Sequence, residues 1–149
     1  MNNSFNYVIC NKDRINQEAN PLYYDINFGG LNTQYDNFYI EVLQCNITDE
    51  IDDTNDYLIM TCKGLHENGI FCPNFLNADE CILCTIPVLT VDTKQGLGGI
   101  SFRSNNCRML KTIRITFYTQ DLVPVVATDI NTVAETQWIL TLRMTPIIN

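Results

Sequence analysis

Residues 112–117 read Thr-Ile-Arg-Ile-Thr-Phe, a strict alternation of polar and apolar side chains. Successive side chains of an extended strand point to opposite faces, so the three apolar residues share one side and the three polar residues share the other. This pattern is typical of a β-strand with one buried face and one solvated face. The alternation covers the run from Arg108 to Tyr118, and we expect a strand there.

The same period of two recurs along the chain, and no stretch shows a helical period. Ile, Thr, Tyr and Phe are frequent and suit a pleated, half-buried surface, whereas Ala is scarce. Pro87 lies inside one of the runs and predicts an edge, a bulge or a break there, because proline cannot donate to a central ladder. The expected strands are Phe5–Ile9, Leu22–Phe28, Asn37–Cys45, Tyr57–Cys62, Cys81–Val91, Arg108–Tyr118, Leu122–Ala127 and Thr136–Met144.

Most of these runs are bounded by Gly, Pro, Asn or Asp, and no linker or internal repeat divides the sequence. A chain of 149 residues is long enough to bury a core of its own. We therefore expect one all-β domain over residues 1–149, an antiparallel sandwich or barrel of about eight strands.

Charge and hydropathy exclude several classes of function. The chain has 9 Lys and Arg against 17 Asp and Glu, a net charge of −8, which repels the phosphates of nucleic acids and anionic membranes. No apolar run reaches the length of about 20 residues that a bilayer-spanning helix needs. The first residues lack the basic and apolar regions of a signal peptide, so secretion by that route is not expected.

The seven cysteines are an odd number, so at least one has no partner within the chain. Cys10, Cys45, Cys62 and Cys84 lie inside or beside apolar runs. A free cysteine in such a place behaves as a small hydrophobic residue. We interpret the cysteines mainly as buried thiols of a protein in a reducing compartment, rather than as a disulfide framework.

The spacing Cys81-x-x-Cys84 is the one feature of the sequence that resembles a metal site. Cys62, His66 and Cys72 are the residues that could complete a set of zinc ligands. Residues three apart in a regular strand point to opposite faces, so we do not expect Cys81 and Cys84 to bind one ion together. A redox-active pair would need a helix N-terminus to lower the thiol pKa, and none is expected here.

Other candidate chemistry has a plainer interpretation. His66 is the single histidine, and no serine lies in a nucleophile motif, so we expect neither an enzyme nor a cofactor. The acidic segment Asn46 to Asp56 has the oxygen ligands that calcium prefers, but it lacks the EF-hand spacing, and we interpret it as a solvated loop. The glycine-rich segment Gln95 to Gly99 lacks the lysine of a phosphate-binding loop, and we interpret it as a turn between strands.

The long segment from Lys63 to Glu80 carries apolar side chains that a solvated loop would not need. These residues either pack on their own domain or become buried against a partner. They are Leu65, Ile70, Phe71, Phe75 and Leu76.

The last third of the chain supplies a resemblance. Residues 112–117 are followed by a loop and then by residues 136–147, which read Thr-Gln-Trp-Ile-Leu-Thr-Leu-Arg-Met-Thr-Pro-Ile. This arrangement resembles the end of the small jelly-roll capsid proteins of large double-stranded DNA viruses. The resemblance implies a single jelly roll of two packed four-stranded sheets and a role as a minor capsid or penton subunit in the virion, assembled in the host cytoplasm.

On this basis we expect an oligomeric structural protein whose partners are copies of itself or a major capsid protein. Two other functions stay open: a β-sandwich module that binds a glycan or a protein receptor, and, less favoured, a small metal-dependent or cysteine enzyme. The expected contact residues are Leu65, Ile70, Phe71, Phe75 and Leu76 of the long segment, and Ile147 and Ile148 near the end of the chain.

Overall fold

The computed structural model describes residues 3–15, 23–28, 34–48, 57–65, 80–87, 93–96, 100–105, 107–125 and 137–148, with the backbone alone at 48 and 93–96. These residues form nine β-strands and two short 3-10 helices. The strands are β1 (Phe5–Cys10), β2 (Tyr23–Asn27), β3 (Phe38–Thr48), β4 (Tyr57–Lys63), β5 (Glu80–Pro87), β6 (Thr93–Gly96), β7 (Ser101–Ser104), β8 (Thr112–Thr119) and β9 (Gln137–Pro146). The 3-10 helices are η1 (Asn11–Asp13) and η2 (Cys107–Met109).

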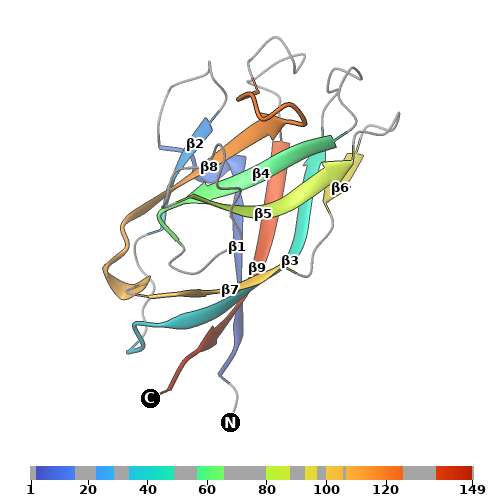
Figure 1. Ribbon diagram of the computed structural model, residues 1–149. Helices are drawn as coiled ribbons and strands as arrows, with labels where there is room; N and C mark the ends of the chain where they lie inside the picture. The colour runs from blue at the N-terminus through green and yellow to red at the C-terminus, as the bar shows by residue number, and fades with distance from the viewer. Residues whose placement is uncertain are drawn as a thin grey trace.

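The strands form two antiparallel sheets that face each other (Figure 1). Sheet A has the order β1-β9-β3-β6, and β7 also pairs with β3. Sheet B has the order β2-β8-β4-β5. Strands β7 and β6 pair with opposite ends of β3, at residues 38–41 and 45–48, so together they fill one edge of sheet A. The predicted all-β, antiparallel β-sandwich is confirmed.

The strand pairs are nested along the chain. Strand β1 pairs with β9, β2 with β8, β3 with β6 and β7, and β4 with β5. Each strand of the first half therefore lies in the same sheet as its partner from the second half. From β1 to β4 the chain alternates between sheet A and sheet B. Because β1 and β9 are antiparallel neighbours, the two ends of the described chain leave from the same end of the molecule (Figure 1).

The core lies between the two sheets and is built by the alternating faces that the sequence predicts. In β8 the buried apolar residues are Ile113, Ile115 and Phe117. In β9 every second residue from Trp138 to Met144 is buried. Each large side chain removed from water contributes about 1.5–3 kcal/mol to folding, so these faces hold the two sheets together.

Three aromatic rings close one end of the core. The ring of Trp138 lies 5.2 Å from that of Tyr24 and 6.1 Å from that of Phe117. Tyr24 and Phe117 are themselves 6.2 Å apart, and all three pairs meet edge to face. Tyr24 and Phe117 belong to sheet B and Trp138 to sheet A, so this cluster joins the sheets directly.

Two β-bulges shift the alternation within a strand. In β3 the pairing with β9 skips Leu43, and the buried positions change from Val42 to Cys45. In β5 the pairing with β4 skips Leu83 in the same way. A bulge inserts one extra residue into one strand, so every side chain beyond it changes face.

Several strand predictions were wrong in detail. Instead of beginning a strand, Leu122 ends a turn with a φ of +65° and donates its N–H to the Thr119 carbonyl at 3.0 Å. Pro124 then forms an isolated bridge with Tyr118. Strands β6 and β7 were not predicted, and Gln95 and Gly96 belong to β6 rather than to a turn. Pro87 ends β5, an edge strand of sheet B, as expected of a proline. Within the described ranges, no helix is long and apolar enough to cross a membrane.

Candidate functional site

The outer face of sheet A carries an apolar patch, which we call the β1–β9 patch. It consists of Val8, Cys10 and Ile139. Cys10 lies directly opposite Ile139 in the antiparallel pair, and Val8 lies two residues away on the same face. Val8 is 54% exposed and Ile139 is 39% exposed. Neighbouring apolar side chains on an outer face contribute little to folding, and such patches favour contact with another molecule.

A hollow of about 320 Å³ adjoins the β1–β9 patch. The Trp138 backbone N–H donates to Asn11 Oδ1 at 3.2 Å and thereby fixes η1 against the start of β9. The Asn46 side-chain oxygen is buried and accepts no hydrogen bond from the described residues. The hollow thus places the Asn46 side chain, whose oxygen is buried, beside exposed apolar atoms. Its lining residues are Cys10, Asn11, Lys12, Asn46, Gln137, Trp138 and Ile139.

The other end of the same face is more polar. Arg143 Nη1 lies 3.5 Å from Glu41 Oε2, and both side chains are about half exposed. A pair in this setting contributes little to stability, because water and salt screen it. Tyr39, two residues from Glu41 along β3, is 55% exposed.

The outer face of sheet B is built around a row of charges. Strand register places four charged residues side by side across the sheet, in the order Asp25, Arg114, Lys63 and Glu80. Arg114 donates from Nε to Asp25 Oδ1 at 2.7 Å and from Nη2 to Oδ2 at 3.2 Å. Its guanidinium also lies 4.2 Å from the centre of the Tyr23 ring. The hydrogen bonds to Asp25 are the main cause of the raised pKa of Arg114.

Glu80 ends the row as a carboxylate that is only 4% exposed. The Tyr118 hydroxyl donates to its two oxygens at 3.2 and 3.3 Å. Burial, and then the nearby Glu80 charge, raise the pKa of Tyr118 to about 12. Thr61, in the next row of the sheet, is fully buried and donates to the Thr116 carbonyl at 3.3 Å. The polar groups of this face are thus satisfied within the chain.

A second hollow, of about 370 Å³, lies at the Arg114 end of this row. It is open to solvent and is bordered by both charges of the Asp25–Arg114 pair. Asp25 and Arg114 already hydrogen-bond each other, so fewer of their polar atoms are available to a ligand. We therefore favour the hollow beside the β1–β9 patch as the candidate site. The lining residues of the second hollow are Ile15, Asp25, Lys63, Gly64, Thr112, Ile113 and Arg114.

The structure corrects the expected orientation of Cys81 and Cys84. Both side chains are fully buried, Cys81 opposite Cys62 and Cys84 opposite Met60. The bulge at Leu83 is the reason, because one extra residue brings two positions three apart onto the same face. No local pattern of residues indicates this bulge.

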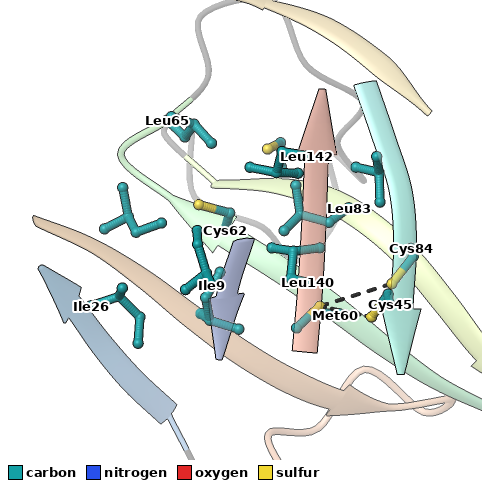
Figure 2. Close-up of a cluster of buried hydrophobic side chains, with 14 of the residues drawn as sticks. Ile9, Ile26, Cys45, Met60, Cys62, Leu65, Leu83, Cys84, Leu140 and Leu142 are labelled. Carbon is teal, nitrogen blue, oxygen red and sulfur yellow. Dashed lines mark hydrogen bonds between the residues drawn. The ribbon is translucent and has the colours of Figure 1, made fainter. Parts of the chain in front are cut away.

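Sulfur atoms from three strands meet in the core (Figure 2). The Cys45 thiol donates to Met60 Sδ at 3.1 Å, and the Cys84 thiol to the same atom at 3.9 Å. A hydrogen bond with Cys45, followed by burial, raises the pKa of Cys84 well above its ordinary value. Among the described residues, no group of three or more His, Cys, Asp or Glu is placed to hold a metal ion.

The prediction that most cysteines are buried, free thiols is confirmed for the described ones. The exception is Cys10, which is half-buried on the outer face of sheet A. The buried cysteines are Cys45, Cys62, Cys81, Cys84 and Cys107.

Of the expected contact residues, Leu65 is only 1% exposed, packs in the core and cannot form an outer surface. Its carbonyl also accepts a hydrogen bond from Ser104 Oγ, which fixes the end of β4 to β7. The Ile147 N–H donates to the Asn37 carbonyl at 2.9 Å, and Ile148 is 68% exposed. Ile70, Phe71, Phe75 and Leu76 lie outside the described residues, as do His66, Cys72 and the acidic residues 49–56.

The β1–β9 patch was missed by the sequence reasoning. A signal was present, because Val8 and Ile139 are apolar residues at positions where the alternation calls for polar ones. No protein-family model matches this sequence, and no curated protein matches it either. The residues and their geometry therefore carry the functional argument alone.

Proposed function

We propose that this chain is a structural subunit of a virus shell, a single jelly roll that acts through contacts with neighbouring proteins. The observation that carries the proposal is the nested strand order, β1-β9-β3-β6 facing β2-β8-β4-β5. Nested antiparallel pairs of this kind arise when one long hairpin is rolled up so that its strands are shared between two sheets. Double-sheet jelly rolls of about eight strands are a recurrent design of viral capsid domains.

The position of β9 adds support. It is the Trp-containing strand on which the resemblance to small capsid proteins rests, and it lies inside sheet A between β1 and β3. Trp138 on its inner face joins the two sheets through aromatic contacts. Ile139 on its outer face belongs to the exposed β1–β9 patch. One strand thus serves both the fold and the candidate contact surface.

The contact surface in this proposal is the outer face of sheet A at the β1–β9 patch and the adjoining hollow. Neighbours in a shell, either copies of this chain or a larger capsid protein, would cover Val8 and Ile139. A shell also offers a way to cover the free edges of a sandwich, which otherwise invite uncontrolled pairing.

Mass spectrometry of purified virus particles tests the proposal. It predicts that this chain is present at a fixed number of copies per particle and stays bound in high salt, since an apolar contact is not weakened by ionic screening. A protein that is a soluble monomer in infected cells and absent from particles would contradict the proposal.

The hollow beside the patch favours a second candidate, a module that binds a glycan. Asn11, Asn46 and Gln137 bring amide groups to its lining, next to the apolar Ile139. Sugars present hydroxyls and apolar ring faces that suit such a mixture. A glycan array separates the two functions: saturable binding that Asn46→Ala abolishes supports the module, whereas a silent array leaves the shell subunit as the better account.

A further inference from the structure

Cys62 and Cys81 stand directly opposite each other in the antiparallel pair of β4 and β5. Directly opposite residues have Cα atoms roughly 4.5–5.5 Å apart, which falls within the roughly 4.4–6.8 Å range of a disulfide. Both side chains point into the core and are fully buried. The backbone spacing and the shared face therefore already meet the geometric needs of a cross-strand disulfide.

The thiol environment agrees with this spacing. The Cys81 sulfur accepts a hydrogen bond from the backbone of Cys62, so it already lies against its opposite residue. The other described cysteines have different surroundings. Cys45 and Cys84 contact each other and Met60, but they lie on β3 and β5, which belong to different sheets, rather than opposite each other in one strand pair. Cys107 hydrogen-bonds Ser104 within its own turn. Cys10 faces outward on the other sheet.

We propose that Cys62 and Cys81 form a reversible disulfide whose oxidant is a low-molecular-mass disulfide of the glutathione type. The Cys81 thiolate attacks one sulfur of the oxidant and forms a mixed disulfide, and a first small thiolate leaves. The Cys62 thiolate then attacks the Cys81 sulfur of the mixed disulfide and releases the second small thiolate. The two protein thiols lose two protons and two electrons in total, and the oxidant is reduced to two thiols.

The fold controls how fast this reaction proceeds. Burial raises the pKa of Cys81 to about 12 and also raises the pKa of Cys62, so neither thiol is reactive while the core is closed. Among the strands that the structure describes, β5 is an edge strand that pairs with β4 alone. Local opening of β5 therefore exposes Cys81 without unfolding the sandwich. The disulfide then fixes this edge strand to β4.

Oxidation of the folded, full-length chain with oxidised glutathione tests the proposal. Samples are quenched with acid, remaining thiols are alkylated under denaturing conditions, and disulfide-linked peptides are identified by mass spectrometry. The expected result is that the Cys62–Cys81 peptide pair is the first intramolecular link to accumulate. The oxidised chain should also have a higher urea midpoint, and a reductant should return it to the starting value.

Two variants keep the test decisive. Cys81→Ala should abolish both the link and the midpoint shift, whereas the matched control Cys107→Ala, which also removes a buried thiol, should keep both. Oxidation of the same chain in concentrated urea should give mixed pairings, since the native register is lost. The proposal is overturned if the folded chain links other cysteines first, or if Cys62 and Cys81 are recovered fully alkylated after prolonged oxidation.

Discussion

The outer faces of the two sheets differ in which side chains they present to solvent. On sheet B, Asp25 is paired with Arg114, and the carboxylate of Glu80 is held by Tyr118. On sheet A, the end formed by β1 and β9 leaves Val8 and Ile139 exposed. Both faces belong to strands whose inner sides are equally apolar, so the difference does not come from the core.

This contrast indicates which face is built for contact. A sandwich needs apolar side chains only on its inner faces, and polar residues outside keep it soluble. On sheet B's outer face, the charged side chains Asp25, Arg114 and Glu80 have partners within the chain, and Tyr57 is 41% exposed. The side chains of the β1–β9 patch gain nothing in the isolated chain and would gain by being covered. We therefore propose sheet A as the side that makes contacts.

The largest expected change in stability comes from comparing substitutions on the inner and outer faces of one strand, β9. Trp138→Ala removes a buried ring that contacts Tyr24 and Phe117, and should lower the free energy of unfolding by about 3–5 kcal/mol. Ile139→Ala, one residue away on the outer face, should lower it by no more than about 0.5 kcal/mol. Urea unfolding curves measure both. A loss for Ile139→Ala as large as that for Trp138→Ala would mean that the patch belongs to the core.

A smaller effect compares the ion pairs of the two faces. Asp25→Ala breaks two hydrogen bonds to Arg114 and should cost about 1 kcal/mol of stability, a value reduced by the partial exposure of the pair. Glu41→Ala removes the longer pair with Arg143 on sheet A and should cost less than about 0.5 kcal/mol. A double-mutant cycle of Asp25→Ala with Arg114→Ala isolates the coupling. The corresponding cycle for Glu41 and Arg143 gives the comparison. Equal coupling energies in the Asp25–Arg114 and Glu41–Arg143 pairs would contradict a stronger ion pair on sheet B.

Alkaline pH should weaken sheet B through Tyr118. Its folded pKa of about 12 lies above the ordinary value of 10.0, so folding favours the neutral phenol. The stability it contributes is fully present below about pH 10 and is lost as the pH rises toward about 12. Tyr118→Phe should therefore reduce the fall in urea midpoint between these pH values, whereas Tyr39→Phe on sheet A should keep the wild-type fall. An unchanged fall in Tyr118→Phe would contradict the raised pKa of Tyr118 in the folded chain.

The sequence predicted the fold class and the buried face of most strands because alternation is a local property. It failed where the outcome depends on a neighbouring strand. The bulge at Leu83 depends on the register with β4 and places Cys81 and Cys84 on one face. The short strands β6 and β7 exist because β3 provides a partner for each.

The candidate site was foreseen least well. Leu65 was expected at a contact surface, and its burial depends on a tertiary contact with Ser104 that no local pattern contains. Ile148, by contrast, is exposed as a contact residue must be. The β1–β9 patch joins residues from the two ends of the chain, and only the pairing of β1 with β9 brings them together.

The most direct test of the account is the number of copies per purified particle for a chain carrying Val8→Asp and Ile139→Asp. A matched control, Tyr57→Asp with Asn27→Asp, adds the same two charges to the outer face of sheet B. Both should fold with nearly wild-type stability, because all four positions are exposed. The account predicts that the sheet A variant loses incorporation by about tenfold or more while the control is retained. Equal incorporation of the two variants would contradict a contact surface on sheet A.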